Sequence, residues 1–299
     1  MDGLNFRPLT FAEEPLLRRY LSVADSLSCE MSLANLLLWL PDTGSIYTEY
    51  KGRLLIAAVG DGLLFFPLGE KFAPSELAEI FAGIRGMGIA VDEIYDVPPD
   101  YIADNPDLPD YFLVEQSPDY ADYIYDLHKL VDMSGGRLRK KRNLIRQFER
   151  EYPDAILGEI TRDNFEEFIE LSHRLFAATE LTPTLEQEIS IWPMVEKNFF
   201  RPELGLGSLT LSVNGRMIGF AIYSCLGQSC YDIHFEKVDH TFKGAGQYLV
   251  RALADKLCKM GGKLMNREQD LGLPGLRQAK ETLDPLLLYR RGVLKPRQS

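Results

Sequence analysis

The polar residues best placed for chemistry lie at the ends of two expected strands in the second half of the 299-residue chain. Residues 231–236 alternate apolar and polar side chains and end at Glu236, a pattern typical of a strand with one buried face. A second expected strand, residues 263–270, ends in a run of polar residues: Asn266, Arg267, Glu268 and Asp270. Polar clusters at the same end of two neighbouring strands favour a functional site over an ordinary solvated edge.

A glycine-containing loop separates these two strands. Residues 241–246 read Thr-Phe-Lys-Gly-Ala-Gly, and apolar residues then recur at helical spacing from Leu249 to Leu257. The loop therefore opens a helix, where unpaired backbone N–H groups and the helix dipole favour an anion. The expected phosphate-binding residues are Lys243, Gly244, Ala245, Gly246 and Gln247. A simple strand-to-helix turn is the alternative interpretation.

Together the two strand ends and the loop carry the groups that acyl transfer requires. Such a reaction needs a general base, a positioned acceptor and a group that stabilises the developing oxyanion. Glu236 and Asp270 are the candidate bases, and Arg267 is the candidate oxyanion or phosphate ligand. Three further residues of the cluster are candidate substrate contacts: Asn266, Glu268 and Lys280. At each position the alternative is an ion pair within the cluster, such as Glu268 with Arg267 or Lys280.

A dense basic run follows Gly135-Gly136 on an expected helix that ends near Pro153. The candidate substrate contacts in it are Arg137, Arg139, Lys140, Lys141 and Arg142. One interpretation is a footprint for phosphates of a tRNA acceptor arm, a CoA-like cofactor or an anionic lipid. The other is a solvated helix whose charges pair with nearby Asp and Glu.

Composition narrows the class of protein. A net charge of −11 argues against a general nucleic-acid binder, so any such contact must be local. No apolar run approaches the roughly 18–20 residues that span a bilayer. The acidic N-terminus does not read as a signal peptide, and we expect a cytoplasmic protein. The four cysteines form no CxxC pair, and no metal site is predicted.

The order of expected elements repeats in the two halves. In the first half, a strand and two helices precede a three-strand meander over residues 45–68, a helix beginning at Pro74 and a strand over residues 88–95. The second of those two helices is expected to be stopped by Pro41. In the second half, a strand and two helices precede a hairpin about Asn214-Gly215 and the strands and loop described above, and residues 286–294 close the sheet. This order predicts an internal duplication.

Three segments carry a resemblance to a known family: HFEKVDHTFKGAGQYL (residues 234–249), NREQDLGLPGLRQAK (266–280) and YDLHKLVDMSGGRLRKKRN (125–143). They resemble the soluble catalytic domain of the phosphatidylglycerol lysyltransferase family, which is similar to the GNAT acyltransferases and the Fem-type peptidyltransferases. The resemblance implies an α+β fold of two GNAT-like domains in tandem, each a mixed, mostly antiparallel sheet flanked by helices. We expect domains at residues 1–119 and 153–299, joined by a crossing segment at 120–152, with the active cleft in the second.

The resemblance also implies a transferase that moves an amino acid from aminoacyl-tRNA to an amine or hydroxyl of a small molecule, a peptide or a lipid headgroup. One alternative is an N-acyltransferase that uses CoA or acyl-CoA as its donor, and another is a non-catalytic binding module on the same fold. The GNAT phosphate loop, Q/R-x-x-G-x-G/A, matches here at Gly244 and Gly246. Thr241 stands at the Q/R position, which argues against ordinary acetyl-CoA use.

Overall fold

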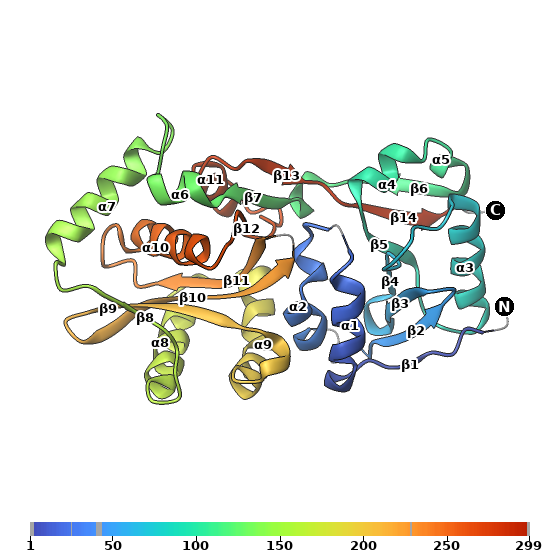
Figure 1. Cartoon of the computed structure of the whole chain (residues 1–299), viewed down its shortest axis with the longest axis horizontal. Coiled ribbons are helices and arrows are strands. Elements are labelled where there is room, and N and C mark those ends of the chain that lie inside the picture. Colours follow the sequence, from blue (N-terminus) through green and yellow to red (C-terminus); the bar gives the residue numbers. More distant parts are fainter. Residues whose placement is uncertain (1–2, 25, 40–43, 228, 298–299) are drawn as a thin grey trace. The chain divides into compact units, whose positions relative to one another are not determined.

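The chain folds into two compact units, shown in Figure 1. The computed structural model describes residues 3–24, 26–39, 44–227 and 229–297. One unit comprises Met1–Ala121 and Tyr289–Ser299, and the other comprises Asp122–Leu288. This division differs from the expected domains at residues 1–119 and 153–299, because segments from outside each expected domain supply strands to its sheet.

The first unit is built on a mixed sheet of seven strands in the order β1-β2-β3-β4-β5-β14-β6. Only β4 and β5 pair in parallel among its strand pairs in the described ranges. The strands are β1 (Arg7–Pro8), β2 (Ile46–Tyr50), β3 (Arg53–Ala58), β4 (Leu63–Phe65), β5 (Glu93–Val97), β6 (Phe112–Glu115) and β14 (Gly292–Pro296). The α-helices are α1 (Glu14–Leu21), α2 (Leu33–Leu38), α3 (Pro74–Gly86), α4 (Pro99–Asp104) and α5 (Leu108–Tyr111). The apolar face of α3 packs on the sheet through Leu77, Ile80, Phe81 and Ile84.

The second unit has a seven-stranded sheet in the order β13-β7-β12-β11-β10-β9-β8, in which β11 and β12 are parallel. Its strands are β7 (Asp122–Asp126), β8 (Ile156–Gly158), β9 (Gly207–Val213), β10 (Arg216–Gly227), β11 (Cys230–Val238), β12 (Leu264–Asn266) and β13 (Leu287–Tyr289). Its α-helices are α6 (Leu127–Asp132), α7 (Arg139–Glu151), α8 (Phe165–Ala177), α9 (Pro183–Asn198), α10 (Ala245–Lys259) and α11 (Pro274–Glu281).

Both faces of the second sheet are covered by helices (Figure 1). Helices α8 and α9 lie against one face, where Phe168 and Trp192 contact Phe220 of β10. Helices α6, α7 and α10 lie against the other, around a core that includes Leu249 and Leu253. The central strands therefore need apolar side chains on both faces. None of the helices in the described part of the chain is long and apolar enough to cross a membrane.

The two units repeat one order of elements, as the sequence predicts. Read from β1 and from β8, each sheet begins with three antiparallel strand pairs and continues with a parallel pair. In each unit a single long helix connects the parallel strands, namely α3 between β4 and β5 and α10 between β11 and β12. Among the described residues, two α-helices likewise separate the first two strands of each sheet, namely α1 and α2 in the first unit and α8 and α9 in the second.

The sixth strand of each sheet comes from a distant part of the sequence. Strand β7 precedes the rest of the second unit, and β14 follows it but pairs with β5 and β6 of the first. Residues 286–294 were expected to close one sheet, but they supply β13 to one sheet and most of β14 to the other.

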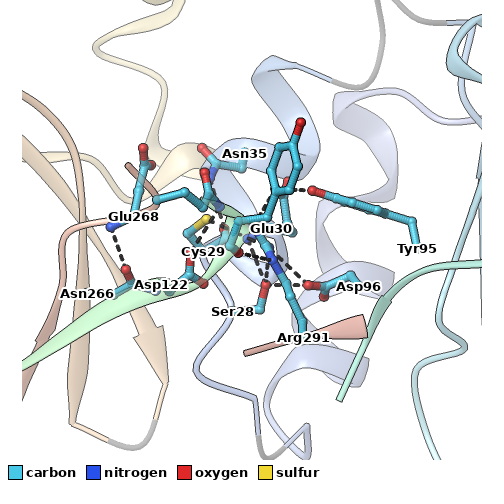
Figure 2. A network of polar contacts seen from close by, with 12 residues as sticks. Ser28, Cys29, Glu30, Asn35, Tyr95, Asp96, Asp122, Asn266, Glu268 and Arg291 are labelled. Carbon is cyan, nitrogen blue, oxygen red and sulfur yellow. Dashed lines mark hydrogen bonds and ion pairs between the residues drawn. The ribbon is translucent and has the colours of Figure 1, made fainter. Parts of the chain in front are cut away.

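A buried ion pair fixes β14 in the first unit. Figure 2 shows the Arg291 guanidinium, just before β14, at 3.0 Å from Asp96 Oδ1 and 2.6 Å from Ser28 Oγ. Glu30 lies 3.1 Å from the same guanidinium. Because a buried carboxylate left without its partner is strongly destabilising, the pairing of Asp96 with Arg291 ties the C-terminal strand to β5.

The predicted hairpin turns are present in the structure, but two predicted strands are shorter than expected. Lys51-Gly52 and Asn214-Gly215 have positive φ at both residues, as two-residue hairpin turns require. The strand expected over residues 88–95 begins only at Glu93, and the one expected over 263–270 ends at Asn266. The expected end of a helix at Pro41 lies outside the described residues, and α2 ends at Leu38.

Candidate functional site

A cavity of about 660 Å³ opens in the second unit where β11 and β12 separate. The two parallel strands pair from Cys230 with Leu264 as far as Asp232 with Asn266, and beyond that point they diverge. The polar lining residues include Lys141, Arg174, Thr179, Glu236, Gln247 and Arg267. Four cationic lining residues (Lys141, Arg174, Lys237 and Arg267) face two anionic ones (Glu236 and Asp239), so the cavity favours an anion.

A β-bulge in β11 determines which residues reach this cavity. Phe235 pairs with Ile222 of β10 and Ile233 pairs with the next residue, Tyr223, so His234 is the extra residue. Ile233 therefore joins the core beneath α10, while Phe235 packs edge-on against Trp192 of α9 at a ring separation of 5.0 Å. The regular alternation predicted over residues 231–236 is wrong at His234, because the bulge reverses the facing of every later side chain in the strand.

Glu236 and Arg267 face each other at the cavity. The Arg267 Nη2 atom donates to Glu236 Oε1 at 2.8 Å, and the two side chains are only 15% and 17% exposed. Within the described ranges, Glu236 Oε2 is buried and has no hydrogen-bond partner. The carboxylate is thus held by one oxygen, and its other oxygen can accept a proton.

Lys141 of α7 adds a second positive charge beside Arg267. Burial lowers the pKa of Lys141 below its ordinary value of 10.5, and the positive charge of Arg267 lowers it further. An anionic group of a ligand placed between the two cations would relieve this repulsion. The cavity is therefore electrostatically prepared for a phosphate or an oxyanion.

The glycine loop opens α10 at the cavity. Gly244 adopts φ +90°, and a Cβ atom there would lie 2.4 Å from the backbone oxygen of Leu144 in α7. Only glycine fits this close approach. The first turn of α10 has no side-chain cap, and Gly246 and Gln247 line the cavity. The Ala245 N–H donates to the Phe242 oxygen at 3.1 Å, and the next N–H groups, those of Gly246 and Gln247, can therefore bind a ligand anion.

The remaining predicted loop residues have different roles. Ala245 is fully buried in the core, and Lys243 is exposed. Thr241 lines the cavity, but its backbone N–H and hydroxyl both donate to Asp239 Oδ1, at 3.0 and 2.5 Å. A threonine therefore closes the loop onto Asp239 at the position where GNAT enzymes carry Gln or Arg.

Asp270, the second candidate base, is buried in a structural cluster. Arg277 donates to both of its oxygens at 2.8 Å, and Tyr123 and Gly272 donate at 2.6 and 2.8 Å. Burial raises the pKa of Asp270, but these hydrogen bonds outweigh burial and leave the pKa below its ordinary value of 3.8. With its oxygens occupied, Asp270 is placed to anchor α11.

Lys280 and Asn266 shape the end of β12. The Lys280 ammonium, only 7% exposed as a residue, donates to the backbone oxygens of Arg267 at 2.6 Å and of Gln269. Asn266 Oδ1 accepts from the backbone N–H of Glu268 at 2.6 Å, and Glu268 adopts φ +55°. The backbone therefore turns away after Asn266, which ends the strand early and presents Arg267 to the cavity.

The basic segment from Arg137 to the end of helix α7 contains three groups of side chains. Ile145 and Phe148 pack into the core, and Lys141 lines the cavity. Arg142 donates to the backbone oxygens of Met133 and Gly135, and Arg137 pairs with Asp284 at 2.9 Å. The exposed cations of the helix are Arg139, Lys140, Arg146 and Arg150, here called the basic stripe. No carboxylate of the described residues forms an ion pair with them, so the alternative of a helix neutralised by nearby Asp and Glu does not describe this stripe.

Comparison with known proteins gives the family. Residues 22–290 match the family described as phosphatidylglycerol lysyltransferase, C-terminal. The chain belongs to this family. A conserved protein of unknown function from Bacteroides thetaiotaomicron has a TM-score of 0.84 at 23% identity, with 98% of this chain and 100% of that chain covered. L-PGS from Bacillus licheniformis has a TM-score of 0.61 at 16% identity, with 87% and 86% covered.

A further relative is the uncharacterized protein MYCGA3080 of Mycoplasmoides gallisepticum, which is 22% identical over 78% of this chain and 75% of its own length. The predicted resemblance to the lysyltransferase family is confirmed, and so is the fold of two GNAT-like units in tandem.

The sequence analysis did not predict that α8 contributes to the cavity. Arg174 and Thr179 line it from α8 and from the turn that follows the helix. Arg174 lies in an amphipathic helix with no motif and Thr179 just after it, so only the packing of α8 on the sheet shows that they reach the site. The expected strand ends and glycine loop do meet at one place, as their order in the chain suggested.

We predict that Asp270→Asn weakens folding without acting on the cavity. Because Arg277 is partly exposed and can turn to solvent, we expect a loss of roughly 2 kcal/mol in the free energy of unfolding at pH 7. The pKa of Asp270 is depressed by folding, so its contribution is present above pH 3.8 and is lost as the pH falls through the folded-state pKa. Urea unfolding of both proteins between pH 3 and 7 measures this.

Asp255→Asn is the matched control, since its ion pair with Lys259 is exposed and should contribute less than about 1 kcal/mol. If the stability difference between the wild type and Asp270→Asn stayed constant down to the lowest pH, Asp270 would not stabilise the fold as a hydrogen-bonded carboxylate.

Proposed function

We propose that this protein transfers an amino acid from aminoacyl-tRNA to an amine or hydroxyl acceptor in the cavity between β11, β12, α8 and α10. The observation that carries the proposal is Glu236, whose Oε2 atom is buried at the cavity without a partner in the described ranges while Arg267 holds Oε1. Membership of the phosphatidylglycerol lysyltransferase C-terminal family supports aminoacyl transfer as the class of reaction.

The proposed chemistry uses these groups in turn. Glu236 Oε2 accepts the proton of the acceptor N–H or O–H as the acceptor attacks the carbonyl carbon of the aminoacyl ester. Arg267 or the backbone N–H groups at the start of α10 stabilise the oxyanion that develops. The bond from that carbon to the ribose oxygen then breaks, and the ribose oxygen takes the proton from Glu236. A new amide or ester and a free tRNA terminus result.

The basic stripe supports the choice of tRNA as donor. Arg139, Lys140, Arg146 and Arg150 lie exposed on the helix whose Lys141 reaches the cavity. Unpaired surface cations in a chain of net charge −11 are suited to phosphates rather than to neighbouring carboxylates. A tRNA backbone held by the stripe would bring its acceptor end towards Lys141 and Arg267. Because aminoacyl-tRNA is found in the cytoplasm, we propose that this protein acts there.

We propose only the chemical class of the acceptor, an amine or a hydroxyl. The family name makes the headgroup of phosphatidylglycerol the first hydroxyl acceptor to test, and small amines and peptides are the next.

A CoA thioester is the second candidate donor, favoured by the uncapped start of α10 at the cavity. Against it stands Thr241, whose hydroxyl is engaged by Asp239. A thermal-shift series with CoA and acetyl-CoA separates the two donors, because only a CoA-dependent enzyme should be stabilised by micromolar CoA.

We predict that replacing Arg139, Lys140 and Arg146 together by Ala weakens binding of aminoacyl-tRNA and flattens its salt dependence. Losing up to three phosphate contacts should reduce the slope of log K against log salt by roughly two units. Filter binding at several salt concentrations measures both quantities. The control replaces Arg216, Lys259 and Lys263 by Ala, which removes the same number of positive charges from elsewhere in the second unit. If the two triple variants had equal slopes of log K against log salt, tRNA would be excluded as the donor.

We also predict that Glu236→Gln, in a protein that remains folded, lowers the rate of amino-acid transfer by about 10²–10⁴-fold, because the amide cannot accept the proton. The assay follows discharge of bulk aminoacylated tRNA with phosphatidylglycerol vesicles or small amines as acceptors. Glu149→Gln, which alters an ion pair with Arg251 outside the lining of this cavity, is the control. Full activity of Glu236→Gln would exclude Glu236 as the base.

A further inference from the structure

A second cluster of ionisable groups lies beside the cavity, around the bulge in β11. Asp232 and His234 come from β11, and Glu268 follows β12. The His234 Nδ1 atom lies 3.5 Å from Asp232 Oδ2 and 3.7 Å from Glu268 Oε1. One nitrogen or oxygen atom from each residue lies within 4.8 Å of the others. In the proposed transfer reaction these three side chains have no part.

The orientation of His234 distinguishes this cluster from a chance gathering of acidic residues. Its side chain is only 5% exposed, and its Nε2 atom lies 2.8 Å from the hydroxyl of Ser224 on β10. Its buried Nδ1 atom points at the two carboxylates but forms no hydrogen bond with any described residue. If Nε2 carries the proton and donates it to Ser224, Nδ1 presents a lone pair to two carboxylates. Such a set of acceptors calls for a cation.

The distances suit a metal ion. Nitrogen and oxygen ligands at about 2.0–2.1 Å from a tetrahedral Zn²⁺ lie roughly 3.4 Å apart, close to the 3.5 and 3.7 Å measured from Nδ1. The contact of the outer ring nitrogen with the Ser224 hydroxyl at 2.8 Å would orient the ring, a role that a carboxylate, a backbone carbonyl or water usually has at a histidine ligand. The Glu268 carboxylate is 29% exposed, which gives an ion and a water ligand access from solvent.

The local charge also favours a cation. Asp232 and Glu268 lie at His234, and Asp122 and Lys280 both act electrostatically on Glu268. With three carboxylates against one ammonium, these ionised side chains have an excess of two negative charges. A divalent ion would balance the remaining charge.

We propose that Asp232, His234 and Glu268 bind one divalent transition-metal ion of the Zn²⁺ type, with water as its fourth ligand. One imidazole and two carboxylates favour Zn²⁺ over Mg²⁺, which prefers six oxygen ligands. The ion would link His234, in the bulge of β11, to Glu268, which follows β12. It would thereby help to fix the separation of the two strands that opens the cavity. This site is independent of the proposed transfer reaction, because its test measures metal binding alone.

The test is calorimetric titration of the chelator-treated full chain with Zn²⁺ and, separately, with Mg²⁺. We expect one Zn²⁺ per chain and much weaker Mg²⁺ binding. Loss of an outer-shell partner costs about 10–100-fold in metal affinity, so Ser224→Ala should weaken Zn²⁺ binding within that range. His234→Gln and Glu268→Gln each remove a ligand and should weaken it by more than about 100-fold. His173→Gln, which alters an exposed ring paired with Glu196, should leave it unchanged.

Anomalous diffraction from wild-type crystals soaked in Zn²⁺ decides the case where a variant does not fold. A peak among Asp232, His234 and Glu268 supports the site. The proposal is overturned if no Zn²⁺ binds, if folded His234→Gln and Glu268→Gln bind it as tightly as the wild type does, or if the anomalous peak lies elsewhere.

Discussion

The buried ammonium of Lys280 holds the backbone conformation on which the candidate site depends. It donates to the backbone oxygens of Arg267 and Gln269, just after β12 ends. Those carbonyls are therefore satisfied without a neighbouring strand, and β12 can leave β11 after the pair Asp232 and Asn266. A buried carbonyl left unpaired costs about 1–3 kcal/mol, so this contact is a structural requirement. The cavity, the exposure of Arg267 to it and the approach of Glu236 all follow from that separation.

The sequence predicts the parts of this arrangement that depend on neighbouring residues. Asn214-Gly215 specifies a tight hairpin, and the Gly244 loop specifies a helix start, because each turn needs residues that tolerate positive φ. Alternation alone could not show the bulge at His234, which arises from the pairing of β11 with β10. Nor could alternation show that Glu236 lines the cavity while Asp270 is buried with both oxygens occupied. That difference arises because Arg277 and Tyr123 reach Asp270 from other elements. The order of expected elements predicted the duplication, and the family resemblance supported it and implied that each half is GNAT-like.

Domain limits were harder to predict for the same reason. Strand β7 pairs with β12, about 140 residues later in the chain, and β14 pairs with β5, about 200 residues earlier. Local propensity carries no information about such partners. Strand β14 therefore lies outside the contiguous segment that forms most of its unit, whereas β7 opens the contiguous segment Asp122–Leu288. Buried Arg291, with Asp96 and Ser28, is a contact that selects the position of β14 (Figure 2).

The distribution of charge gives the account its most direct test. An acidic chain carries an exposed basic stripe on α7 and an electropositive cavity next to an uncapped helix start. The decisive measurement is equilibrium binding of the wild-type protein to bulk aminoacylated tRNA, and in parallel to CoA, at two salt concentrations. The account predicts tRNA binding that weakens steeply with salt and no retention of CoA. Retention of CoA with no tRNA binding at either salt concentration would contradict it.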